Sequence, residues 1–220
     1  AMKSEDLDLS GSAHGGLDVT RESADLAAAT WNGTLDALEN RGAYAMRLAT
    51  PAAVQLAHAR VRVGATRLAV ADGNVRLTEF AWDDGRIATS GSFAGVPLAS
   101  VARFAGEPLP FRSTVTLGGE WSLAAAPRLT GTMMVRRETG DVFLTRSATS
   151  DSTVAAGITA LEAVARFTDD AVDATALLRS TRGDTADAKL AIGAVADAPP
   201  GRLAADAPLD FSVTGDIPSL

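Results

Sequence analysis

The chain has 220 residues, a formal net charge of −7, no cysteine, and 46% hydrophobic but only 5% aromatic residues. An acidic chain whose largest basic cluster is Arg136-Arg137 lacks the positive patch that nucleic acid and anionic membrane surfaces require, so we expect neither as a partner. The absence of cysteine excludes disulfides and thiolate metal sites. No apolar run approaches the roughly 18 to 20 residues of a membrane helix. A compact chain of this length would bury about 70% of its unfolded surface.

The first third of the chain alternates between apolar and polar residues, which is typical of half-buried β-strands. Two short strands, containing Leu7 to Gly11 and Leu17 to Val19, are predicted to join at Gly15-Gly16. The pair Asn32-Gly33 predicts a hairpin turn. Further strands are expected at residues 24–29, 44–48, 54–56, 61–63 and 68–70.

Turn signals then follow one another closely. Asp72-Gly73 and Asp83-Asp84-Gly85 predict two turns, and Ile87 to Phe93 forms the returning strand. Phe80 and Trp82 are one residue out of step with the alternation before them, which predicts a β-bulge near Glu79.

One segment has helical spacing. Pro97 suits the first position of a helix, apolar residues recur at helical intervals up to Ala105, and Gly106 stands where a C-terminal cap belongs. We therefore predict one short helix near residues 97–105. A helix this short is marginal alone, so it must pack against the sheet.

The clearest strand pattern covers Val115 to Val135, where apolar residues occupy every second position on both sides of Ala125-Ala126-Pro127. Beyond Leu144 the pattern weakens. Residues 158–167 fit a helical face or a strand, and we favour the strand. Turns are expected at 168–170 and 182–184, a loop at 197–208, and a last strand at 209–217.

Several strands end in glycine after alternating apolar residues, as in Leu7 to Gly11, Ile87 to Gly91, Leu129 to Gly131 and Phe211 to Gly215. Their spacing is irregular, so this is a degenerate repeat of one strand-based unit. The predicted fold is all-β: an elongated, mainly antiparallel sheet curved into a U-shaped trough, with one short helix. Residues 1–2 are interpreted as left over from expression, and residues 3–220 as one segment. A division into two stacked units near residues 94–110 stays open.

Seven short blocks resemble the central repeats of TamB-type translocation and assembly module proteins. The blocks are Trp31–Leu35, Leu48–Ala52, Phe93–Ala99, Gly118–Leu123, Leu129–Asp141, Asp206–Leu209 and Asp216–Leu220. The resemblance covers most of residues 3–220 and is thin between Ser147 and Ala198.

This resemblance implies a piece of a longer protein of the AsmA-like group, anchored in the inner membrane and crossing the periplasm of a Gram-negative cell as a β-taco with a hydrophobic groove. It further implies phospholipid transport toward the outer membrane, and outer-membrane assembly with a TamA-like barrel that other regions would contact. The motifs of the family are structural, so the resemblance implies no catalytic residue and no cofactor.

Other chemistry has weaker support in the residues. His14 and His58 have no cysteine or carboxylate at metal-binding spacing. The pairs Asp83-Asp84 and Asp169-Asp170 suit turns better than acid–base catalysis. Arg182-Gly183-Asp184 and Asn32-Gly33-Thr34 match short recognition motifs but are also simpler as turns. We therefore expect no enzyme and no metal site.

The apolar side chains of the strands are candidates for a groove that binds phospholipid acyl chains. A scaffold or chaperone for outer-membrane protein strands remains an alternative, and a secreted β-helix enzyme or adhesin acting on glycans is a further one. The candidate lining residues are Val115, Leu117, Trp121, Leu123, Leu129, Met133, Val135, Leu209, Phe211 and Val213.

Overall fold

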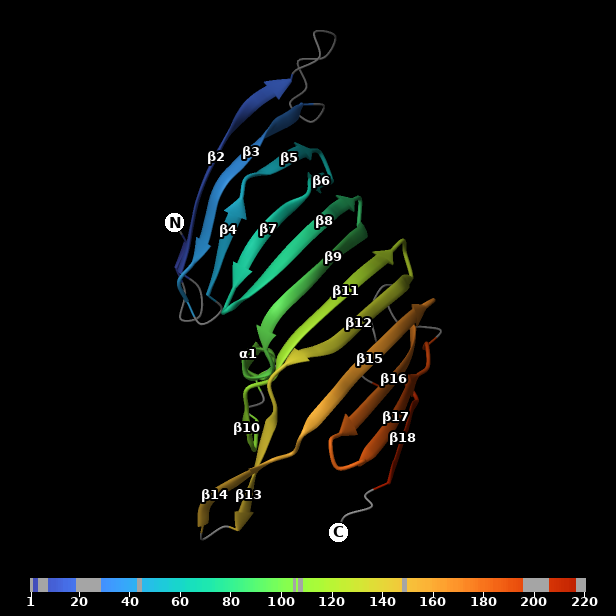
Figure 1. Cartoon of the computed structure of the whole chain (residues 1–220). Coiled ribbons are helices and arrows are strands. Elements are labelled where there is room, and N and C mark those ends of the chain that lie inside the picture. The colour runs from blue at the N-terminus through green and yellow to red at the C-terminus, as the bar shows by residue number, and fades with distance from the viewer. Residues whose placement is uncertain are drawn as a thin grey trace.

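The structure is a computed structural model, and it describes residues 2–3, 8–18, 29–42, 45–104, 106, 109–147, 150–195 and 206–216. Strands lie side by side in one long antiparallel sheet, and the described residues contain one short helix (Figure 1). The predicted all-β class with a single short helix is therefore confirmed.

The main sheet has 15 strands, and its hydrogen-bonded path runs β1-β2-β3-β4-β7-β8-β9-β11-β12-β15-β16-β17-β18. Strands β5 and β6 form a side branch between β3 and β8. The strands of this sheet are β1 (Met2–Lys3), β2 (Asp8–Asp18), β3 (Thr30–Asn40), β4 (Met46–Thr50), β5 (Ala52–Ala57), β6 (Arg60–Val63), β7 (Thr66–Val70), β8 (Gly73–Asp83), β9 (Arg86–Pro97), β11 (Thr116–Ala125), β12 (Leu129–Thr139), β15 (Ile158–Thr168), β16 (Ala171–Ser180), β17 (Thr185–Ile192) and β18 (Leu209–Asp216).

A second, three-stranded sheet projects from the lower end of the main sheet (Figure 1). It consists of β10 (Arg112–Ser113), β13 (Val142–Ser147) and β14 (Ser150–Ala155), with β13 in the middle. The weak pattern beyond Leu144 did not predict it.

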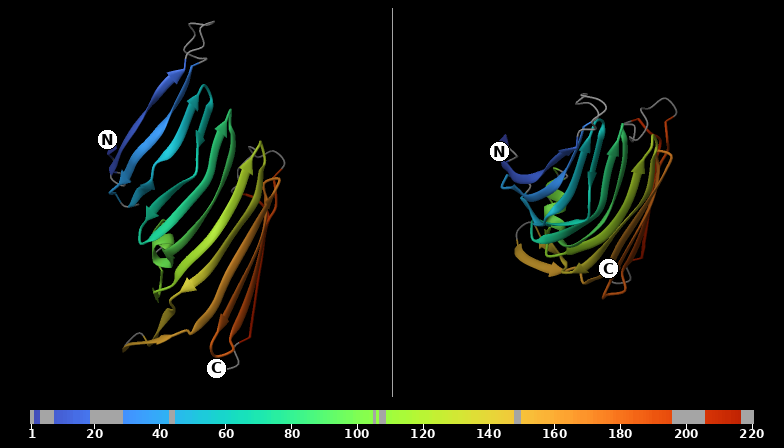
Figure 2. Two further views of the ribbon diagram at one scale, coloured as in Figure 1. Left: turned by 45° about the horizontal axis from the view of Figure 1, so that its top comes forward. Right: turned by 90° about the horizontal axis from the view of Figure 1, so that it is seen from above.

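The main sheet is a single curved layer, and its strands bend in the same sense like the ribs of a trough (Figure 2). The chain exposes 14184 Å², whereas a compact protein of its mass would expose about 9,500 Å². Folding therefore buries about 57% of the unfolded surface and not the 70% expected of a compact chain. The difference arises because the described strands form no second layer over most of the sheet.

The expected bulge and several expected turns are present. The register between β8 and β9 shifts between Leu77 and Glu79, as predicted. Asp84 and Gly85 both have positive φ, and so do Asp169 and Asp170, which matches the two-residue turns that join twisted antiparallel strands. Residues 158–168 form strand β15 and not a helix.

Two predicted turns are wrong. Gly15-Gly16 lies inside β2 and Asn32-Gly33 inside β3, where Gly15 pairs directly with Gly33. A side chain at either of these paired glycines would come closer than 3.0 Å to the ring of Trp31. These glycines therefore make room for an aromatic ring in the middle of a long strand. The strand expected at residues 24–29 lies almost wholly outside the described residues, as does Ile217.

The predicted helix is α1 (Leu98–Phe104), and it is followed by Gly106, whose φ is +78°. The Gly106 amide donates to the carbonyl of Arg103, which satisfies one carbonyl of the last turn. The Leu98 amide donates to the carbonyl of Val115 at 2.9 Å, which fixes the helix to the segment leading into β11. The main sheet continues past this helix, because β9 pairs directly with β11.

Asp141 joins the two sheets at the point where the chain leaves β12. Its carboxylate accepts hydrogen bonds from the amides of Val142 at 2.8 Å, Gly157 at 2.9 Å and Ile158 at 3.0 Å. Burial raises the pKa of this carboxyl group. The three amide hydrogen bonds and the charge of Arg137 together lower it by more, so the pKa ends below its ordinary value.

We expect Asp141→Ala to lower the free energy of unfolding by about 2 to 3 kcal/mol, because three backbone donors lose a charged acceptor. Asp173→Ala, on an exposed strand position, is the control and should change it by less than about 0.5 kcal/mol. Urea unfolding measures both.

The stabilisation by Asp141 should depend on pH. Because folding lowers the pKa of its carboxyl group, this stabilisation is fully present above the pKa of the unfolded chain and is lost as the pH falls through the pKa of the folded protein. The stability difference between wild type and Asp141→Asn should therefore shrink below about pH 4.

Candidate functional site

The candidate site is one whole face of the main sheet. Residues that pair directly across antiparallel strands point to the same face, so the register places side chains without ambiguity. Following the pairs from strand to strand, one face carries almost only apolar side chains and glycine. We call it the apolar face.

Four lateral rows make up most of the apolar face, and each row is continuous from strand to strand. Thr66 and Thr89 are the only residues with polar side chains in these rows. The rows are Leu17, Trp31, Leu56, Val61, Trp82, Ile87, Ala125, Leu129; then Gly15, Gly33, Val54, Val63, Phe80, Thr89, Leu123, Gly131, Phe167, Val172, Ile192, Leu209; then Thr66, Leu77, Gly91, Trp121, Met133, Ala165, Ala174, Leu190, Phe211; and Leu48, Leu68, Val75, Phe93, Gly119, Val135, Ala163, Ala176, Ala188, Val213.

The opposite face is mainly polar. Its central row contains two apolar side chains, Met134 and Val164, among charged and hydroxyl-bearing ones, and the row runs Arg67, Arg76, Ser92, Glu120, Met134, Val164, Thr175, Lys189, Ser212. From β2 to β18 the sheet path covers about 50 Å at the usual strand spacing. The result is a long surface with one apolar and one water-compatible side.

The apolar face lies on the inner side of the curve. Its side chains are mostly half-buried, whereas those of the polar face are mostly exposed. Helix α1 also lies inside the curve (Figure 2), where Val96 and Leu117 of the apolar face are 6% and 5% exposed. Along the rest of the sheet no second layer of described strands covers the apolar face.

All ten predicted lining residues belong to this region, but they are not equally accessible. Val115 and Leu117 are only 1% and 5% exposed beside α1. They belong to the small core beneath the helix, where a ligand cannot reach them. The five from Trp121 to Val135 are half-buried on the apolar face. The remaining three, on β18, are the most open, with Phe211 62% exposed.

Aromatic rings lie flat on the apolar face because glycines stand beneath them. The ring of Trp121 covers Gly91 on the paired strand, and the ring of Phe93 covers Gly119. A side chain at either glycine would come closer than 3.0 Å to the ring. The indole of Trp121 also donates to the hydroxyl of Thr89 at 3.1 Å, which satisfies its one polar atom. The surface therefore stays low and smooth around its largest side chains.

The sequence predictions missed much of this face. Strands β5 to β9 contribute Val54, Leu68 and Phe93, and β15 to β17 contribute a run of alanines that includes Ala165 and Ala176. The signal was present as alternation. Only the register between strands places these residues on the same face as Trp121.

The predicted turn carboxylates and histidines lie apart from the apolar face. No group of three potential metal ligands is found among the described residues. The ring nitrogen Nδ1 of His14 lies 2.7 Å from a carboxylate oxygen of Asp36, an exposed pair on the polar side of β2 and β3. The carboxylate of Asp170 accepts a hydrogen bond from the amide of Leu129 at 2.6 Å and so stabilises the start of the neighbouring strand β12.

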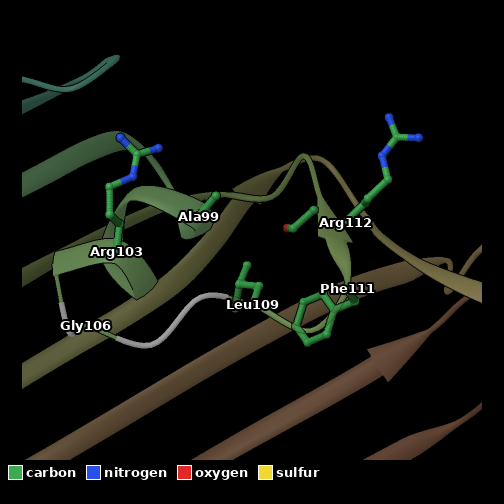
Figure 3. Close-up of a pocket in the computed structure, with 7 residues that line it drawn as sticks. Ala99, Arg103, Gly106, Leu109, Phe111 and Arg112 are labelled. Atoms are coloured by element: carbon green, nitrogen blue, oxygen red, sulfur yellow. The ribbon is translucent and has the colours of Figure 1, made fainter.

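A separate hollow of about 480 Å³ lies beside α1, between the helix and β10 (Figure 3). It is lined by Ala99, Arg103, Gly106, Leu109, Phe111, Arg112 and Ser113.

Within the described part of the chain, the one helix is too short to cross a membrane. No protein-family model matches the sequence. No curated protein and no solved structure matches it significantly either.

Proposed function

We propose that this chain is a non-catalytic segment of a lipid conduit, in which the apolar face carries phospholipid acyl chains while the headgroups stay in water at the open side. The observation that carries the proposal is the lateral pairing that runs without a gap from β2 to β18 and is apolar or glycine at every position but Thr89, on the inner side of a curved single layer. The resemblance to TamB-type proteins adds the cellular setting: transport across the periplasm toward the outer membrane.

The energetics suit movement along the sheet. An acyl chain gains about 0.8 kcal/mol for each methylene that leaves water. Successive rows present similar side chains, so a lipid that shifts by one strand exchanges one apolar contact for another at little net cost. The free energy of transferring an acyl chain from a membrane to this face is also close to zero, because the bilayer interior is as apolar as the face.

The thin lining fits the same function. Alanine fills much of the apolar face on β15 to β17, and flat rings over glycine keep the surface low elsewhere. A trough filled by large side chains would leave no room for a guest. An apolar surface this large would otherwise favour aggregation, so something must cover it in the cell.

Site-specific photocrosslinking tests the proposal. A benzophenone amino acid replaces Met133, on the apolar face, or Thr132, the exposed neighbour on the polar face of the same strand. After incubation with vesicles of phosphatidylethanolamine and phosphatidylglycerol, we expect at least about tenfold more lipid adduct at position 133, since only that side chain faces the bound acyl chains. Mass spectrometry of the irradiated protein measures the adducts. Equal adducts at the two positions would contradict lipid binding on the apolar face.

A second candidate function is favoured by one observation. Strand β18 ends the sheet, and its Leu209, Phe211 and Val213 are 58% to 66% exposed. An open edge of this kind can accept an added strand, as a scaffold for outer-membrane protein strands would require. Crosslinks from Ser212 to an unfolded barrel protein, without lipid adducts at Met133, would favour this alternative.

A further inference from the structure

The hollow beside α1 has a composition unlike the rest of the inner surface. Leu109 and Phe111 are half-buried in it, and two arginines stand at its sides, Arg103 on α1 and Arg112 on β10. Figure 3 shows the two guanidinium groups extending from opposite sides of the hollow, with Ala99 and Leu109 between them. Its volume of about 480 Å³ lies in the range of small-molecule sites.

Within the part of the chain that the structure describes, neither arginine forms an ion pair or a hydrogen bond through its side chain. Other arginines are engaged: Arg60 pairs with Asp83 at 3.2 Å, and Arg182 donates to the carbonyl of Ala155 at 2.7 Å. In a chain with a net charge of −7, two guanidinium groups that have no partner among the described residues form a local exception to the overall field at this hollow.

The hollow also adjoins the apolar face. Ser113 lines it, and two residues later Val115 is buried where the Leu98 amide of α1 donates to its carbonyl. Leu117 continues from there onto the apolar face. The segment that lines the hollow therefore leads directly into the strand that carries the apolar face.

We propose that this hollow binds the anionic headgroup of an amphiphile, with a phosphate or carboxylate between Arg103 and Arg112 and the first methylenes against Leu109 and Phe111. Guanidinium groups suit these anions because their planar N–H donors match two oxygens at once. The inference deepens the proposed conduit and rests on it for the path of the tail. It assigns to this chain a preference for anionic over zwitterionic lipids.

Calorimetric titration of the whole chain tests the site, with three probes: dihexanoylphosphatidylglycerol, dihexanoylphosphatidylcholine and inorganic phosphate. We expect the phosphatidylglycerol to bind about tenfold more tightly than the phosphatidylcholine, and inorganic phosphate to bind more weakly than either. Arg103→Gln and Arg112→Gln should each lower the affinity for phosphatidylglycerol about tenfold and remove the preference. Arg76→Gln, an exposed arginine on the polar face, is the matched control and should change neither.

Each other result has a definite meaning. Inorganic phosphate binding as tightly as phosphatidylglycerol, with the same loss in both variants, would overturn the amphiphile site in favour of a simple anion site. Equal binding of the two lipids, unaffected by either arginine variant, would overturn the headgroup site and leave the conduit standing. A selective, arginine-dependent titration together with equal crosslinking at Met133 and Thr132 would overturn the conduit and leave the headgroup site.

Discussion

Replacing Ala165 by glutamate is expected to reduce lipid binding by about 100-fold or more, because a carboxylate in the middle of the apolar face must lose its water when an acyl chain covers it. Ala165 pairs with Met133 on one side and Ala174 on the other, both on the same face. The free energy of unfolding should change by less than about 1 kcal/mol, since water reaches this face in the empty protein. Fluorescence titration with a pyrene-labelled phospholipid measures the binding.

The matched control uses the same strand and the same change. Ala160 lies on the polar face of β15, opposite Arg179, so Ala160→Glu adds an equal charge on the other side of the sheet. It should bind the labelled lipid like wild type. Ala165→Leu, which adds bulk without charge, should retain binding within about threefold. Wild-type affinity in Ala165→Glu would mean that acyl chains do not lie across this part of the sheet.

The alternation of residues predicted the strands of this fold because each strand separates an apolar side from a polar one. Phe80 and Trp82 even revealed the bulge near Glu79, since their change of phase keeps both rings on the apolar face after the register shift. The alternation along one strand was therefore sufficient to predict which residues share a face of that strand.

The glycines were harder to interpret, since glycine signals both turns and close packing. Asn32-Gly33 has the composition of a hairpin turn but lies in the middle of β3, where Gly33 accommodates the ring of Trp31. The ring belongs to the same strand, so what separates the two roles is the pairing of Gly33 with Gly15 of β2, which places the glycine inside a strand and not at a turn. The segment around Asn32-Gly33 does not contain that pairing.

The alternation of residues predicted an apolar face but not its extent. Ten lining residues were named from three strands, whereas the apolar face runs across the whole path from β2 to β18. Burial also removes Val115 and Leu117 from the accessible lining, because α1 packs where they lie. Both the lateral rows and the position of α1 depend on register and tertiary packing, which spacing along the chain does not contain.

The glycines beneath the rings give the second large prediction. Gly91→Val is expected to lower the free energy of unfolding by about 3 kcal/mol, because a side chain there meets the ring of Trp121 and the carbonyl of Arg76. Valine favours strands, so β-propensity alone would predict the opposite sign. Urea unfolding followed by tryptophan fluorescence measures the change.

Gly16→Val separates steric overlap from the effect of valine itself. Gly16 also lies within a strand, but a Cβ atom there meets nothing within 4 Å, so this variant should be neutral or stabilised by up to about 1 kcal/mol. In a Trp121→Ala background, Gly91→Val should lower the free energy of unfolding by at least about 1 kcal/mol less than it does in the wild type. The reason is that one of the two steric clashes is then gone. Equal costs with and without Trp121 would show that the ring does not rest on Gly91. The smooth lining on which the proposed lipid movement depends would then need another origin.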